Sequence, residues 1–90
     1  MEKKAIILKV FGRVQGVGFR YYTQKKANEL NIFGFVQNML DGSVYIEAEG
    51  QEENLNTFID WVSKGPSWAR VRQVQKQWVP VKNYTEFEIR

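Results

Sequence analysis

The apolar residues of this chain recur with two different periods, and these periods predict a series of strands and helices. Over residues 4–11 and 44–49, apolar and polar residues alternate, which is typical of a half-buried strand. Over 19–30 and, more regularly, over 52–64, apolar residues recur every three or four positions, which is typical of a helix. In chain order, the predicted elements are a strand over 4–11, a helix over 19–30, strands over 32–38 and 44–49, a helix over 52–64, a strand over 71–79 and a short strand over 85–89.

Turn-forming residues support these boundaries. Asp41-Gly42 stands between two strand-like stretches and predicts a tight hairpin. Gly65-Pro66 ends the second helix. Gly34, inside a strand, indicates a bulge or close packing against a helix. The uneven spacing of Val71 and Val74 indicates a bulge in the fourth long strand.

The order strand-helix-strand-strand-helix-strand, followed by one short strand, is that of a split βαβ unit. We therefore predict an α+β fold of the ferredoxin-like type. This is a βαββαβ sandwich with an antiparallel sheet, two helices on one face and a short fifth strand. No linker or repeat interrupts the pattern, so we expect residues 1–90 to form a single domain.

This topology predicts that two distant segments meet. A strand-helix-strand crossover makes the first two strands parallel, so their C-terminal ends lie at the same edge of the sheet. The segment after the first strand contains Arg20, and the second strand ends at Asn38. If the third strand lies between them, the two strands are roughly 10 Å apart, and both side chains can reach one small anion.

The segment 12–20 contains three glycines and two arginines in nine residues. Glycine allows positive φ and close approach to a ligand, and a helix N-terminus behind such a loop attracts anions. The alternative is a soft turn, which the glycine content alone favours. The segment does not match the P-loop pattern, and Tyr21 occupies the place of the third glycine of G-x-G-x-x-G. A nucleotide site is therefore not indicated.

Composition narrows the chemistry further. There is no cysteine and no histidine, which excludes disulfides and thiolate nucleophiles and removes the commonest metal ligand and general base. We expect neither a metal nor a cofactor. The net charge of +3 favours an anionic ligand but is too small to indicate nucleic acid. No stretch has the layout of a signal peptide or the length of a membrane span, so we expect a cytoplasmic monomer without membrane or nucleic-acid partners.

Several blocks of the sequence together resemble the acylphosphatase family. Phe-Gly-Arg-Val-Gln-Gly-Val-Gly-Phe-Arg at 11–20 is similar to one signature of that family. Gly-Phe-Val-Gln-Asn at 34–38, followed by Asp-Gly-Ser-Val at 41–44, is similar to a second. Gly-Pro at 65–66 with Ala-Arg-Val at 69–71, and Tyr-Thr-Glu-Phe-Glu-Ile at 84–89, are similar to later parts. The blocks span nearly the whole chain in the order and spacing of the family.

The resemblance implies hydrolysis of the carboxyl–phosphate bond of small acyl phosphates by in-line attack of water, without a metal. Arg20 matches the arginine that holds the phosphate, and Asn38 matches the asparagine that positions the water. The backbone implied to cradle the phosphoryl oxygens is that of Gln15, Gly16, Val17, Gly18 and Phe19. Phosphoryl transfer depends mostly on positioning and charge stabilisation, so a chain without histidine or cysteine can perform it.

These residues also have structural interpretations. Arg20 could pair with a carboxylate on its own helix, and Asn38 could simply form the turn. Arg13 could contact phosphate, brace the loop or remain a solvated charge. Thr23 could hydrogen-bond Asn38 or its water, or pack on the helix face. Met39, directly after Asn38, is a candidate for tuning substrate fit.

Two other functions are compatible with the sequence. The chain also resembles the N-terminal part of large hydrogenase-maturation carbamoyltransferases, which would make it a carbamoyl-phosphate-handling domain. We expect no partner domain beyond these 90 residues, which disfavours that alternative. The other is a non-catalytic module that binds a small anion or RNA. Glu47 and Glu49 on the third strand would repel an RNA backbone, which disfavours RNA.

Overall fold

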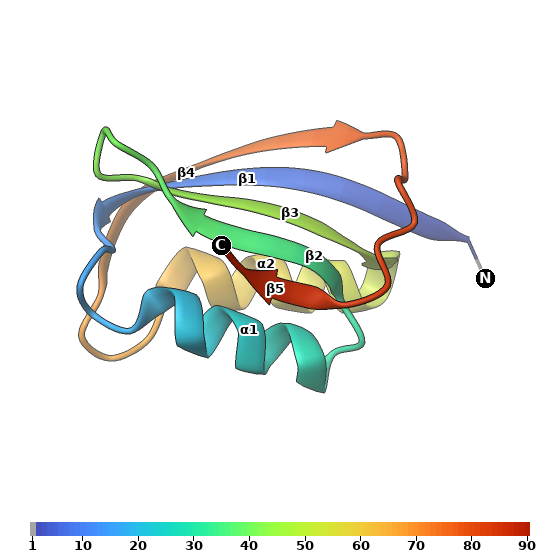
Figure 1. The fold of residues 1–90 in the computed structure, drawn as a ribbon, viewed down its shortest axis with the longest axis horizontal. Coiled ribbons are helices and arrows are strands. Elements are labelled where there is room, and N and C mark those ends of the chain that lie inside the picture. The colour runs from blue at the N-terminus through green and yellow to red at the C-terminus, as the bar shows by residue number, and fades with distance from the viewer. Residues whose placement is uncertain (1) are drawn as a thin grey trace.

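Five strands and two helices make up the fold in a computed structural model that describes residues 2–90 (Figure 1). They follow the predicted order, a βαββαβ unit with a short strand at its end. The elements are β1 (Lys3–Arg13), α1 (Phe19–Glu29), β2 (Phe33–Asn38), β3 (Val44–Gln51), α2 (Glu52–Lys64), β4 (Arg70–Val79) and β5 (Phe87–Ile89). The predicted α+β, ferredoxin-like class is confirmed.

The sheet has the strand order β4-β1-β3-β2-β5. β1 is antiparallel to both β3 and β4, and β3 is antiparallel to β2, so β1 and β2 run in the same direction, as predicted. The short β5 differs from the prediction, because it pairs with β2 in parallel and makes the sheet mixed rather than antiparallel throughout. The route of the chain explains this. β4 is antiparallel to β2, so β4 ends at the end of the sheet where β2 begins. A strand that starts from this end and lies beside β2 therefore runs parallel to β2.

Both helices cover one face of the sheet and enclose the hydrophobic core (Figure 1). Fully burying an aliphatic or aromatic side chain stabilises the fold by roughly 1.5–3 kcal/mol, so this layer is the principal source of stability. Over residues 2–90, no helix is long and apolar enough to cross a membrane. The buried residues of α2 are Leu55, Phe58, Ile59 and Val62, and those facing them from β1 and β3 are Ile6, Leu8, Val10, Val44, Ile46 and Ala48.

The bulge predicted in the fourth long strand is present in β4. Phe11 of β1 pairs with Gln73, whereas the next residue, Gly12, pairs with Val71. β4 therefore carries one extra residue at this point, which accounts for the uneven spacing of its apolar residues.

Gly34 has a different role from the predicted one. It pairs with Ala48 in an unbroken register, so there is no bulge. Its φ is 142°, and a Cβ added here would overlap the carbonyl oxygen of Glu47 on β3. Gly34 therefore permits close approach of the neighbouring strand rather than of a helix.

The β4–β5 connection, residues 80–86, runs from one edge of the sheet to the other. Glu49 of β3 is only 1% exposed and accepts hydrogen bonds from the backbone N–H groups of Lys82 and Tyr84, the latter at 2.9 Å. A buried carboxylate is tolerated only when its oxygens are hydrogen-bonded. Glu49 thus ties the connection to the centre of the sheet.

Glu47, two residues earlier, holds the same connection through side chains. It accepts hydrogen bonds from the hydroxyls of Tyr84 at 2.6 Å and Tyr45 at 2.7 Å, and the Lys82 ammonium lies 3.2 Å away. Burial alone would raise the pKa of Glu47, but these hydrogen bonds outweigh it and lower the pKa below its usual value. Burial and the hydrogen bond to Glu47 raise the pKa of Tyr45 to about 12. The hydrogen bond from Tyr84 to Glu47, together with burial, raises the pKa of Tyr84 to about 12.

We predict that Glu47→Gln destabilises the protein by on the order of 2 kcal/mol near neutral pH and by less at both extremes. Because the pKa of Glu47 is lowered, its carboxylate stabilises the folded state above about pH 4.5, and this stabilisation is lost as the pH falls below that value. Because the pKa values of Tyr45 and Tyr84 are raised, their hydroxyls stabilise the folded state fully below about pH 10, and this stabilisation is lost as the pH rises through about 12. Urea unfolding of both proteins across this range measures the difference. A difference that stays constant with pH would contradict the assignment.

Candidate active site

One cavity of about 220 Å³ brings together the loop after β1, the end of β2 and the end of β5. The strand pairing explains this convergence, because Val44 of β3 pairs with Val10 of β1 on one side and with Asn38 of β2 on the other. Two inter-strand spacings, roughly 10 Å, therefore separate β1 from β2 here. The residues lining the cavity are Val14, Gly16, Gly18, Phe19, Arg20, Tyr21, Asn38 and Ile89.

The loop and the first turn of α1 form an anion-binding arrangement. Gly16 and Gly18 have positive φ values of 73° and 80°, which glycine adopts without the penalty of a Cβ. The first helical hydrogen bond runs from the Tyr22 N–H to the Gly18 carbonyl, so the N–H groups before Tyr22 have no acceptor inside the helix. α1 has no acidic residue in its first turn and no side-chain cap. These N–H groups and the positive end of the helix dipole favour a bound anion.

Arg20 lies in the first turn of α1, where its side chain lines the cavity. Its Nη1 donates a hydrogen bond of 3.0 Å to the backbone oxygen of Arg90. Within residues 2–90 it forms no ion pair with a side-chain carboxylate, which counts against the purely structural interpretation. A guanidinium has five N–H donors, so this single bond leaves donors for a phosphate.

Asn38 is the last residue of β2, and its exposed side chain lines the same cavity. The turn that follows does not use the Asn38 side chain. It is closed by Asp41, whose Oδ1 accepts hydrogen bonds from the Ser43 N–H at 2.9 Å and the Ser43 hydroxyl at 2.5 Å. The amide of Asn38 can therefore interact with a ligand without loss of the turn.

Asp41 is held in its ionised form by this arrangement. The hydrogen bonds from the side chain and the backbone of Ser43, together with Lys9, lower the pKa of Asp41 to about 2. The Lys9 ammonium lies 3.2 Å from Asp41. Over the described residues there is no group of three His, Cys, Asp or Glu side chains that could hold a metal ion. Asp41 thus acts as a turn residue tied to β1.

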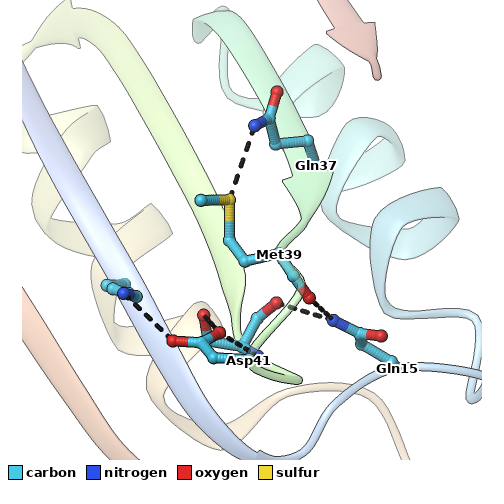
Figure 2. Close-up of polar contacts among 6 residues, drawn as sticks. Gln15, Gln37, Met39 and Asp41 are labelled. Atoms are coloured by element: carbon cyan, nitrogen blue, oxygen red, sulfur yellow. Dashed lines mark hydrogen bonds and ion pairs between the residues drawn. The ribbon is translucent and has the colours of Figure 1, made fainter.

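The side chain of Gln15 extends toward the turn between β2 and β3 (Figure 2). Its Nε2 donates to the carbonyl oxygens of Met39 at 2.8 Å and Ser43 at 2.9 Å. The sequence predicts only a backbone role for Gln15, and no local pattern signals this contact, because its partners are far along the chain. Val17, also predicted in the cradle, packs its side chain against the hydrophobic core.

The structure also places the residues whose roles the sequence leaves open. Thr23 is fully buried on α1, and its hydroxyl has no hydrogen-bond partner among residues 2–90, which favours packing over a bond to Asn38. Arg13 is exposed at the end of β1 and does not line the cavity. The sulfur of Met39 accepts a hydrogen bond of 3.4 Å from Gln37 (Figure 2), and Met39 does not line the cavity either.

The sequence interpretation misses one wall of the cavity. Tyr21 and Ile89 are 58% and 41% exposed, and both line the cavity together with the buried Val14. Tyr21 could have been noticed as a large apolar residue directly after Arg20. Ile89 gives no such signal, because only the pairing of β5 with β2 brings it here.

These features define a ferredoxin-like protein with a cavity suited to a small phosphorylated ligand. The sequence profile of the acylphosphatase family matches residues 6–89. The chain is 47% identical over 85 residues to an acylphosphatase from Archaeoglobus fulgidus, covering 94% of this chain and 96% of that protein. The structure of an acylphosphatase from Coxiella burnetii matches with a TM-score of 0.94 and 35% identity, covering 98% of this chain and 93% of that one. The chain therefore belongs to the acylphosphatase family of hydrolases.

A similar unit also occurs inside a larger protein. The crystal structure of full-length HypF in its phosphate- and nucleotide-bound form matches 98% of this chain with a TM-score of 0.88 and 34% identity. The match covers only 12% of that chain. The same fold is thus found both as a small protein and as part of a much longer one.

Proposed function

We propose that this protein hydrolyses the carboxyl–phosphate bond of small acyl phosphates to a carboxylate and inorganic phosphate, with Arg20 and Asn38 as the catalytic residues. The observation that carries the proposal is the cavity that Arg20, Asn38 and the N-terminus of α1 share. These groups come from α1 and β2, and among residues 2–90 Arg20 forms no ion pair with a side-chain carboxylate.

The phosphoryl group is held by the loop of residues 15–19 and by Arg20. The free N–H groups at the start of α1 and the guanidinium donate to the equatorial oxygens, where negative charge is spread in the transition state. The planar guanidinium fits two phosphate oxygens at once. Binding and charge stabilisation thus come from the same groups.

Asn38 orients the attacking water in line with the leaving group. The water oxygen forms a bond to phosphorus, the bond between phosphorus and the carboxyl oxygen breaks, and the carboxylate leaves with its electron pair. A carboxylate is a good leaving group, so no protein acid is needed to protonate it. We assign the proton of the water to a phosphoryl oxygen or to solvent, because the amide of Asn38 cannot accept it.

The acyl part of the substrate lies against the wall formed by Tyr21, Ile89 and Val14. Exposed apolar side chains gathered at one cavity indicate an apolar ligand. An aromatic acyl group can also stack on the ring of Tyr21. We therefore infer that apolar acyl phosphates, such as benzoyl phosphate, are better substrates than acetyl phosphate.

The proposal is tested by incubating the purified protein with benzoyl, acetyl and carbamoyl phosphate, with and without EDTA. We expect release of inorganic phosphate from benzoyl phosphate at a rate that EDTA does not change. Absence of turnover with all three compounds would overturn the proposed function. Turnover that EDTA abolishes would overturn the metal-free mechanism, and turnover of carbamoyl phosphate alone would favour the carbamoyl-phosphate alternative.

We predict that Arg20→Lys loses most of the activity and that Arg20→Ala nearly abolishes it. The lysine keeps the positive charge but cannot donate two parallel hydrogen bonds to the phosphate. Steady-state kinetics with benzoyl phosphate measure the loss, and Arg72→Lys on the exposed β4 is the matched control. Turnover within about twofold of wild type in Arg20→Lys would contradict the bidentate role.

We predict that Asn38→Ala lowers kcat by on the order of 10²-fold or more, because one preorganised polar group is removed. Competitive inhibition by inorganic phosphate should persist, since Arg20 and the loop are intact. The control is Asn56→Ala on the exposed face of α2. If Asn38→Ala instead unfolds the protein, as circular dichroism would show, the residue has the structural role of a turn former.

A further inference from the structure

The side-chain amide of Gln15 connects the loop after β1 to the turn after β2. Gln15 lies in the loop between β1 and α1, and its two acceptors, the carbonyl oxygens of Met39 and Ser43, lie 24 and 28 residues further along the chain. Met39 directly follows Asn38, and Ser43 directly precedes Val44, which pairs with Asn38. Gln15 thus contacts both ends of the turn of residues 39–43 (Figure 2).

The turn of residues 39–43 is stabilised by hydrogen bonds between its own residues. The Met39 N–H donates to the Ser43 carbonyl at 2.8 Å, and the Gly42 N–H donates to the Met39 carbonyl at 3.1 Å. Asp41 adds the hydrogen bonds to Ser43 described above. A rigid turn transmits a contact at residues 39 and 43 to the adjoining residue 38. The amide of Gln15 is therefore in a position to hold Asn38 at a fixed distance from the loop.

We propose that Gln15 is a positioning residue, whose side-chain amide holds the turn of residues 39–43 against the loop and so keeps Asn38 in register with the phosphate-binding backbone. This inference rests on the proposed function, because it assigns a role to Gln15 through the water that Asn38 orients. An error of about 1 Å in such a position can cost roughly 10²-fold in rate. Gln15 would thus act through its side chain on the turn that follows Asn38, and not only through its backbone in the loop.

The hydrogen-bond pattern allows a clean substitution. Gln15→Met keeps the length of the side chain and removes both donors. The carbonyl oxygens of Met39 and Ser43 each keep the backbone hydrogen bond given above, so neither is left without a partner. Gln15→Glu is a second variant, in which a carboxylate oxygen faces the two carbonyl oxygens and repels them. Neither change removes a backbone N–H group from the phosphate-binding loop.

We expect Gln15→Met to lower kcat by about 10- to 100-fold, with the inhibition constant of inorganic phosphate changed by less than about threefold. Gln15→Glu should have the larger effect on kcat. The matched control is Gln24→Ala, which removes a similar bond, 3.0 Å from its Nε2 to the carbonyl oxygen of Phe87, away from the turn. The control should lower stability without a comparable loss of kcat. Equal loss of kcat in Gln15→Met and the control would overturn the inference.

A double-mutant cycle identifies the residue through which Gln15 acts. If it acts through Asn38, Gln15→Met should cost less than about threefold in kcat when Asn38 is already alanine. The same loss in both backgrounds would mean that Gln15 acts on the loop instead, and would overturn the inference.

A measurement without catalysis separates this inference from the proposed function. In ¹⁵N-edited NMR spectra, the side-chain amide signals of Asn38 should shift or broaden in Gln15→Met and remain unchanged in the Gln24→Ala control. Unchanged Asn38 signals in Gln15→Met would overturn the inference. If the wild type hydrolyses no acyl phosphate, the proposed function fails, and these spectra still decide whether Gln15 positions Asn38.

Discussion

The pairing of β3 between β1 and β2 is the constraint on which the rest of the structure depends. Val44 pairs with Val10 of β1 on one side and with Asn38 of β2 on the other, so the C-terminal ends of the two parallel strands lie at the same end of the sheet. A slip of one residue in either pairing would turn every side chain to the opposite face. The buried Ile46 and Ala48 of β3 prevent such a slip, because they would leave the core. The geometry of the cavity is therefore maintained by hydrophobic packing at a distance from it.

The opposite face of the sheet supports the cavity in a different way. Glu47 and Glu49 hold the β4–β5 connection, which delivers β5 to the edge of β2. Arg90, the residue after β5, places its guanidinium 3.9 Å from the centre of the Phe35 ring. Its backbone oxygen accepts the hydrogen bond from Arg20. Glu47 and Glu49, on the face of the sheet opposite the helices, thus help to orient the guanidinium of Arg20 at the cavity.

The reaction proposed for this cavity requires few kinds of chemical group. Backbone N–H groups at a helix N-terminus, a guanidinium and a primary amide can bind charge and orient water. None of them changes its charge state near neutral pH. This is sufficient for a substrate whose leaving group departs as a stable carboxylate, since positioning and electrostatics supply most of the catalysis in phosphoryl transfer. A chain without histidine and cysteine is therefore well matched to the reaction of its family.

The sequence alone determined the order of the elements, because the apolar periods of strands and helices differ and the turns at Asp41-Gly42 and Gly65-Pro66 separate them. It also indicated that the glycine loop, Arg20 and Asn38 lie close together. A strand-helix-strand crossover makes the first two strands parallel, so their C-terminal ends lie at the same end of the sheet. Only the tertiary structure decided the parallel pairing of β5, the apolar wall that includes Ile89 and the contact of Gln15 with the turn. Each of these joins residues that are distant along the chain, through hydrogen bonds and packing that no local pattern of hydrophobicity encodes.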